Sequence, residues 1–297
     1  MTVARVKRVR AAVAMALLPM ACGGGRGSPA APSPPAGPAA PVAVLSWDHI
    51  HVPIVVGHRG SGNVTAPENT FAAFDSAVAA GAAIETDVRS TRDGVLVLMH
   101  DETVDRTTGT PAGKVSALTY EQLRALDASR VHRPEVFSPQ AIPTFEEYLR
   151  RYGRRLLLPE IKGNAADAEA MARLIQQYGL VDSVLVQSFT PALLRVVKGV
   201  DSAIRTAITS GPRVRPEAAA ANGAWAVLVS APEVTADYVA SMHATGIKVF
   251  AWTVNSPAVA DAMRRHGVDG ILSDDPRLAV AHNLFHSPID DRTGGAP

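Results

Sequence analysis

The stretch that decides the fold holds three apolar, β-prone runs, each ending in polar residues: Ile54-Val55-Val56-Gly57-His58-Arg59, Ile84-Glu85-Thr86-Asp87-Val88 and Val95-Leu96-Val97-Leu98-Met99-His100-Asp101. A hydrophobic core has no use for such residues, because a buried charge is costly unless it is paired. Active sites of parallel α/β barrels form at the carboxyl ends of the strands. The stretch therefore predicts a parallel sheet with a reactive set of side chains along one rim.

Two acidic residues on the second run predict a metal site. Glu85 and Asp87 are two positions apart, so both side chains project to one face while Ile84 and Val88 project to the other. Two carboxylates that converge in a cleft repel each other and lose hydration, at a cost on the order of several kcal/mol. A cation would offset that cost, and oxygen-only ligands favour Mg²⁺ or Ca²⁺ over zinc.

A later run repeats this arrangement: Leu156-Leu157-Leu158-Pro159-Glu160-Ile161-Lys162. Its alternation puts Glu160 and Lys162 on the same face as Leu156 and Leu158, at the end of an apolar strand interior. We interpret Glu160 as a third metal ligand and Lys162 as a phosphate-binding cation. The plainer alternatives are a simple Lys162–Glu160 pair, or carboxylates paired with nearby arginines.

A series of motifs in fixed order resembles the glycerophosphodiester phosphodiesterase family over residues 54–276. The motifs are His58-Arg59-Gly60, Pro67-Glu68-Asn69-Thr70, Glu85-x-Asp87-Val88, Asp93-Gly94, His100-Asp101, Asp105-Arg106-Thr107-Thr108-Gly109, Glu160-x-Lys162, Trp252-Thr253-Val254-Asn255 and Asp269-Gly270-Ile271. Each is weak alone, but the ordered set is specific. The resemblance implies an α/β fold, a TIM (β/α)8 barrel with a small insertion over the barrel mouth. It further implies a small-molecule glycerophosphodiester substrate, cleaved to glycerol 3-phosphate and an alcohol with a divalent cation.

The candidate site residues take distinct roles in this hypothesis. His58 and His100 act as general acid and base, because an unperturbed imidazole pKa near 6.5 suits proton transfer at neutral pH. Arg59 and Lys162 hold phosphoryl oxygens. The resemblance places Trp252 and Phe189 at the glycerol pocket, although aromatic residues at strand ends are more often core. Which histidine is the acid stays open, as does whether water or the substrate's 2-hydroxyl attacks. We expect Asn69 to brace the Arg59 loop, and Asp101, Asp105 and Arg106 to stabilise the insertion.

Two other functions compete with this one. The same barrel could act on larger lipids, as relatives of phosphoinositide-specific phospholipase C or sphingomyelinase D do, or it could be a non-catalytic surface lipoprotein that binds or scaffolds. The Glu160-x-Lys162 strand and the Trp252 motif favour the first function over the lipid enzymes. A binding protein would have no need of both histidines.

Length and composition agree with one catalytic domain. The chain has 297 residues, of which 47% are hydrophobic and 19% charged, and an α/β barrel of about 250 residues forms a single domain. Four of the basic residues lie within the first ten positions, so the net charge of +1 conceals a slightly acidic remainder. No basic face for nucleic acid is expected.

The N-terminus has the pattern of an export signal. A cationic stretch precedes the apolar run 11–18, which is too short to span a bilayer, and Ala21 precedes Cys22. Cys22 is the only cysteine, so no disulfide can form within the chain. It resembles the lipid-modified cysteine of bacterial lipoproteins, although Pro19 and Met20 depart from that pattern. Anchoring to the cell membrane through Cys22 is expected, with simple cleavage and a secreted or periplasmic enzyme as the alternative.

The domain boundaries follow from these segments. We expect a signal peptide at 1–22, a Gly- and Pro-rich linker at 23–45, and a catalytic barrel at 46–286. An insertion occupies about 102–154, and 287–297 is a disordered tail. The insertion carries two candidate caps, Thr119-x-x-Gln122 and Thr144-x-x-Glu147.

Strands and helices alternate along the barrel. Expected strands are 54–56, 83–88, 95–99, 155–161, 183–187, 203–208, 225–230, 247–252 and 269–272. Expected helices are one opened by a Thr65-x-x-Glu68 capping box and ended by Gly81, and then 165–178, 191–198, 216–222, 235–244, 257–266 and 276–284.

Nine strands are one too many for this barrel, and the connection 89–94 is too short for a helical crossover. A hairpin there would tend to carry His100 away from Glu85 and Asp87. We therefore expect an irregular connection that returns His100 to the same rim.

Overall fold

A computed structural model describes residues 45–50, 53–111, 113–132, 135–137 and 139–281. Within them, eight parallel strands form a closed barrel in the order β1-β9-β8-β7-β6-β5-β4-β2, and β1 pairs with β2 to close it. The ninth strand, β3, pairs only with β2. The strands are β1 Ile54–Gly57, β2 Ala83–Ser90, β3 Leu96–Leu98, β4 Leu157–Ile161, β5 Leu185–Ser188, β6 Arg205–Ser210, β7 Ala226–Ser230, β8 Lys248–Trp252 and β9 Gly270–Ser273.

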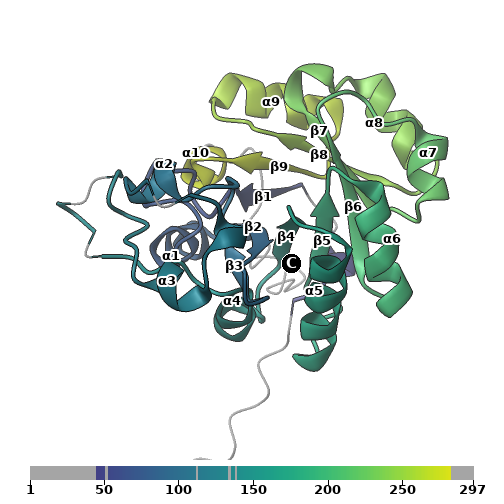
Figure 1. Cartoon of the computed structure of the whole chain (residues 1–297). Coiled ribbons are helices and arrows are strands. Elements are labelled where there is room, and N and C mark those ends of the chain that lie inside the picture. Colours follow the sequence, from purple (N-terminus) through teal and green to yellow (C-terminus); the bar gives the residue numbers. More distant parts are fainter. Residues whose placement is uncertain (1–44, 51–52, 112, 133–134, 138, 282–297) are drawn as a thin grey trace, which may run out of the picture. The chain divides into compact units, whose positions relative to one another are not determined.

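Helices follow the strands and lie outside them, as Figure 1 shows for α5 to α9. The α-helices are α1 Phe71–Ala79, α2 Asp105–Thr108, α3 Tyr120–Arg124, α4 Phe145–Tyr152, α5 Ala165–Gln177, α6 Pro191–Val200, α7 Pro216–Ala221, α8 Ala236–His243, α9 Pro257–His266 and α10 Pro276–Ala281. Three short 3-10 segments are η1 Trp47–His49, η2 Val115–Ala117 and η3 Ala231–Glu233. The predicted TIM barrel is thus confirmed, and its strands and helices from β4 to α9 begin and end within two residues of the expected bounds.

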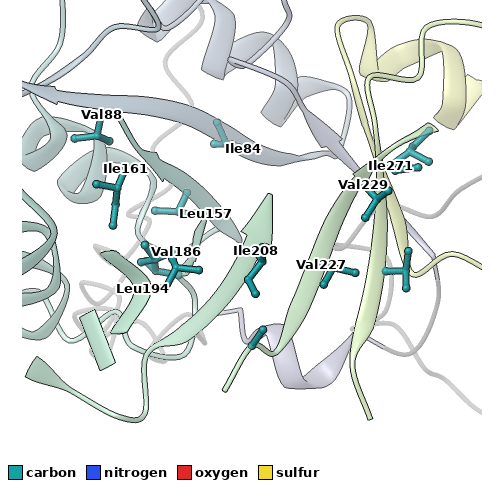
Figure 2. Packing of buried hydrophobic residues seen from close by; sticks show 14 of the residues in the cluster. Ile84, Val88, Leu157, Ile161, Val186, Leu194, Ile208, Val227, Val229 and Ile271 are labelled. Carbon is teal, nitrogen blue, oxygen red and sulfur yellow. The ribbon is translucent and has the colours of Figure 1, made fainter. Parts of the chain in front are cut away.

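Strand alternation divides the apolar residues into an inner and an outer core. The inner cluster fills the barrel and includes Ile54, Ala83, Leu158 and Phe250. The outer cluster lies between strands and helices, and Figure 2 shows part of it: Ile84, Val88, Leu157, Ile161, Val186, Leu194, Ile208, Val227, Val229 and Ile271. Ile84 and Val88 point outward. Side chains alternate along a strand, so Glu85 and Asp87 must point inward, toward the barrel axis.

The connection between β2 and β3 is a hairpin, so the expectation of an irregular connection is wrong. Strand β2 continues past the barrel rim to Ser90, and β3 pairs with it antiparallel, from Ser90 opposite Leu96 to Val88 opposite Leu98. The Met99 amide then donates to the Asp87 carbonyl oxygen at 2.9 Å. Since β2 overshoots the rim, a hairpin brings the chain back to it.

The predicted insertion lies between β3 and β4 and is called the excursion below; it has a small core of its own. Val97, Met99, Val104, Val115, Leu123, Ala128 and Ile142 form this cluster. Helix α4 instead packs in the outer core of the barrel, where the Tyr148 hydroxyl donates to the Ile84 carbonyl oxygen at 2.9 Å. The side-chain caps at Thr119 and Thr144 are both present as full capping boxes, which confirms those two predictions.

Helix α1 begins later than its predicted capping box. Its N-cap is Thr70, whose hydroxyl accepts from the Ala73 amide at 3.3 Å, so the Thr65-x-x-Glu68 prediction is wrong. The physical reason is that Asn69 adopts a left-handed conformation with φ 55°, which a right-handed helix cannot include. Glu68 therefore does not cap helix α1.

The signal segment with Cys22, most of the linker and the C-terminal tail lie outside the described residues. No helix in the described part of the chain has the length and apolar character needed to cross a bilayer.

Candidate active site

Three carboxylates converge at the carboxyl end of the barrel. Glu85 and Asp87 project inward from β2, and Glu160 projects inward from the neighbouring β4, where it lies one strand across from Asp87. One oxygen from each of the three lies within 4.8 Å of the other two, and all three residues are buried. The structure thus brings together the three predicted metal-ligand candidates.

Two cations contact this cluster, and the contact of Lys162 with Glu160 is the pair that the sequence analysis gave as the plainer alternative. The Lys162 ammonium lies 2.9 Å from a Glu160 oxygen and 3.3 Å from an Asp87 oxygen. The Arg59 guanidinium lies 3.5 Å from the other Asp87 oxygen, and the Arg59 backbone amide donates to Glu85 at 2.6 Å. If all three carboxylates are ionised, their negative charge therefore exceeds the positive charge of these two cations.

Burial and mutual repulsion set the proton affinity of these acids. Burial, reinforced by the Asp87 charge, raises the pKa of Glu85 to about 8 and that of Glu160 to about 7. Burial also opposes ionisation of Asp87, but Lys162 and Arg59 outweigh it and hold the pKa of Asp87 below its ordinary value. At neutral pH, without a further cation, the cluster does not carry three negative charges.

His58 follows β1 and is oriented by an acid that the sequence analysis did not single out. The His58 Nδ1 lies 2.7 Å from an Asp274 oxygen, and the Asn255 amide donates to the other Asp274 oxygen at 2.5 Å. With Nδ1 bonded in this way, Nε2 is the nitrogen left for the pocket. Asp274 directly follows β9, so its place after a strand was a usable signal.

His100 is oriented in a similar way by its neighbour in sequence. The His100 Nδ1 lies 2.7 Å from an Asp101 oxygen, and Arg106 donates to the second Asp101 oxygen at 2.6 Å. Two Arg89 nitrogens donate to the His100 carbonyl oxygen at 2.8 and 3.0 Å. Asp101 and Arg106, expected only to stabilise the insertion, therefore belong to the surroundings of the site.

The two imidazoles differ in proton affinity. Burial disfavours the charged form of His58, but its hydrogen bond to Asp274 and the nearby Glu85 raise the pKa above the ordinary value. Burial lowers the pKa of His100, and Asp87 and Asp101 offset only part of that effect. Surroundings that push the pKa values of two titratable groups apart favour a division into acid and base.

A cavity of about 370 Å³ collects these groups. It is lined by His58, Arg59, Glu85, His100, Glu160, Lys162, Gln187, Phe189, Thr209, Trp252, Thr253 and Leu272. Its volume suits a small molecule. The cavity confirms that His100 returns to the rim that carries His58 and Glu85.

Phe189 and Trp252 form an aromatic wall of this cavity. Their ring centroids are 5.7 Å apart at an interplanar angle of 88°, and the Trp252 indole donates to the Leu228 carbonyl oxygen at 3.2 Å. Phe189 is 48% exposed, so it is not a core residue. Lys162 lies 5.6 Å from the Phe189 centroid.

Further polar residues hold the acidic cluster from behind. The Asn69 side-chain nitrogen donates to Asp87 at 2.9 Å, and its side-chain oxygen accepts from the Thr86 hydroxyl at 2.7 Å. The Asn69 backbone amide donates to the Arg59 carbonyl oxygen at 3.0 Å. Asn69 thus braces the Arg59 loop, as expected. Gln187, which the sequence analysis missed, donates to Glu85 at 3.1 Å. Its signal was a polar residue facing inward at the end of an apolar strand.

Comparison with known proteins places this arrangement in one family. The glycerophosphoryl diester phosphodiesterase family matches residues 58–278. The glycerophosphodiester phosphodiesterase of Caldanaerobacter subterraneus is 34% identical over 237 residues, covering 76% of this chain and 96% of that protein.

Solved structures agree with the sequence comparison. The glycerophosphodiester phosphodiesterase of Agrobacterium tumefaciens superposes with a TM-score of 0.70 at 29% identity, covering 77% of this chain and 99% of that one. The Oleispira antarctica phosphodiesterase, solved with its product sn-glycerol-3-phosphate, has a TM-score of 0.70 at 26% identity and covers 80% of this chain and 97% of that one.

Proposed function

This chain belongs to the glycerophosphoryl diester phosphodiesterase family and hydrolyses glycerophosphodiesters, and from that premise we propose a metal-dependent reaction with two histidines as general acid and base. The products are glycerol 3-phosphate and an alcohol. One observation carries the proposal: three buried carboxylates lie within 4.8 Å of one another in a cavity that both histidines line.

The donor set fits Mg²⁺ or Ca²⁺. Glu85, Asp87 and Glu160 supply oxygen ligands only, and both ions prefer oxygen. Burial and the Asp87 charge raise the pKa of Glu85 and of Glu160, and a bound divalent cation would favour the ionised form of both. When bound, the ion would neutralise charge on the phosphodiester as phosphorus is attacked.

The surrounding residues then divide the remaining work. Arg59 and Lys162 line the cavity, where their positive charge and N–H donors would hold phosphoryl oxygens. Phe189 and Trp252 cover the carbon atoms of the glycerol. One imidazole takes the proton of the attacking water, or of the substrate's 2-hydroxyl, as the new P–O bond forms; in the second case water then opens the cyclic phosphate to give glycerol 3-phosphate. The other gives a proton to the alcohol oxygen as the old P–O bond breaks.

The test is release of glycerol 3-phosphate from glycerophosphocholine and glycerophosphoethanolamine. We expect turnover that EDTA abolishes and that Mg²⁺ or Ca²⁺ restores. Full activity in a sample shown by elemental analysis to be metal-free would contradict the metal's role. Turnover of sphingomyelin or lysophospholipid alone would instead favour an enzyme for larger lipids.

Export with lipidation of Cys22 is a separate proposal that rests on the sequence pattern alone. A Cys22→Ser variant that is still exported should lose its membrane association in cell fractionation. Unchanged membrane association would contradict lipidation.

A further inference from the structure

Arg106 occupies an unusual position between two acidic residues. Its guanidinium donates two hydrogen bonds to Glu68, at 2.6 and 2.9 Å, and two to Asp101, at 2.6 and 3.3 Å. It comes from α2 in the excursion, whereas Glu68 comes from the loop between β1 and α1. The Glu68 side chain is only 4% exposed, so this contact joins the excursion to the barrel.

Each of these two acids also holds a residue of the active site. Asp101 lies 2.7 Å from His100 Nδ1, and Glu68 lies 3.1 Å from an Arg59 nitrogen. Arg106 is thus the shared partner of two carboxylates that orient two site residues. One of those residues follows β3 and the other follows β1; both strands pair with β2 but not with each other, so a direct side-chain link between the two residues comes through Arg106.

The loop that carries Arg59 has an uncommon backbone conformation, which side-chain contacts stabilise. Arg59, Asn63 and Asn69 all have positive φ, at 51°, 66° and 55°. Asparagine tolerates this region better than most residues, so the strained position is Arg59, which adopts it only when the surrounding structure holds it there. Glu68 is bound within the loop by Asn63, whose amide donates to it at 2.5 Å. Through its hydrogen bonds to Glu68, Arg106 connects this loop to the excursion.

We propose that Arg106, acting through Asp101 and Glu68, is a positioning residue that sets His100 and Arg59 in their working places relative to each other. The inference rests on the proposed function in that both of those residues act on the phosphodiester. In this proposal the α2 segment of the excursion aligns two residues of the active site that come from different loops.

Loss of Arg106 would affect both arms. Asp101 would keep its bond to His100 but lose the partner that fixes its own orientation. Glu68 would be left with Arg59 as its only charged partner among the described residues, and would draw that guanidinium away from the phosphoryl oxygens. A misplacement of about 1 Å in a site residue can cost about 100-fold in rate.

The direct test is the Arg106→Met variant beside Arg124→Met as a matched control. Arg124 lies on α3 in the same excursion and is exposed. We expect kcat/KM for glycerophosphocholine to fall by about 100-fold in Arg106→Met and by less than about twofold in Arg124→Met. A folded Arg106→Met variant with a rate within about threefold of wild type would overturn the proposal.

Arg106→Lys is the second variant, to be used if Arg106→Met does not fold. Lysine retains the charge but has no planar fork with which to bond two carboxylates bidentately. We expect a loss of about tenfold with little change in the thermal midpoint. Combining it with Asp101→Asn tests the route: the two losses should overlap, because both act on His100. Losses that multiply, or a wild-type rate in Arg106→Lys, would contradict the proposal.

Binding of glycerol 3-phosphate supplies a readout that needs no turnover. Titration calorimetry should show about fivefold weaker binding in Arg106→Lys, because Arg59 is displaced, and unchanged binding in Arg124→Met. If wild type binds the product but turns over no diester, the proposed reaction fails while the positioning role is still decided by these affinities. Equal affinities in wild type and Arg106→Lys would overturn the positioning of Arg59.

Discussion

At the scale of single residues, each histidine of the site is bonded to an acid on its Nδ1 side. Asp274 holds His58 and Asp101 holds His100, both at 2.7 Å. This bonding fixes the tautomer and the ring plane, so that Nε2 is available to substrate. The orienting acids come from different sources, since one directly follows its histidine in sequence and the other lies 216 positions away.

Replacing either histidine tests its role. We expect kcat to fall by about 10²–10⁴-fold in His58→Ala or His100→Ala, the usual contribution of one general acid or base. Mg²⁺ should still raise the thermal midpoint of both variants, because all three carboxylates remain. Near-wild-type turnover in either variant, measured as release of glycerol 3-phosphate, would refute its assignment.

The raised pKa values of two acids predict proton release when metal binds. With pKa values of about 8 for Glu85 and about 7 for Glu160, Glu85 is protonated and Glu160 is mostly protonated at pH 6.5, and a bound cation would expel these protons. Titration of Mg²⁺ or Ca²⁺ in buffers of different ionisation enthalpy should show this release at pH 6.5. The release should be much smaller at pH 9. Equal release at the two pH values would disprove the prediction.

At the scale of elements, the β2–β3 hairpin decides the geometry of the rim. Sequence spacing correctly excluded a helical crossover, yet it did not show how far β2 runs beyond the barrel. That length depends on pairing with two partners, β4 up to Val88 and β3 up to Ser90. Because both pairings are made by the same strand, the hairpin returns His100 to Asp87 instead of carrying it away.

The start of α4 offers a test of an element that the sequence predicted correctly. Thr144 accepts from the Glu147 amide at 3.1 Å, and the Glu147 side chain accepts from the Thr144 amide at 2.9 Å. Thr144→Ala should lower the free energy of unfolding by about 0.5–2 kcal/mol. Thr144→Ser keeps the hydroxyl and serves as the control. Equal denaturant midpoints for the alanine and serine variants would show that the cap contributes little.

At the scale of the whole molecule, the buried acids predict how stability depends on pH. A carboxyl whose pKa is raised on folding binds its proton more tightly in the folded state. Its contribution is present below the ordinary pKa of 4.5 and is lost as pH rises toward about 8 for Glu85. The metal-free protein should therefore lose stability between about pH 5 and pH 8.

The measurement is the free energy of unfolding in EDTA across that range. Glu85→Gln should flatten the slope, because glutamine does not titrate, and saturating Mg²⁺ should flatten it in wild type. A slope that is the same in wild type and Glu85→Gln would show that other groups control it.

The ordered motifs implied the barrel through their resemblance to a family. The sequence by itself determined the alternation of strands and helices, the inward or outward direction of strand residues, and the set of candidate site residues at strand ends. These properties are local, since alternation along a strand and its carboxyl end can be read without knowing any partner. Only the tertiary structure decided which acid holds His58, how His100 returns to the rim, and that Arg106 joins Glu68 to Asp101. Such contacts join side chains far apart in the chain, and they form only where packing has already brought their backbones together.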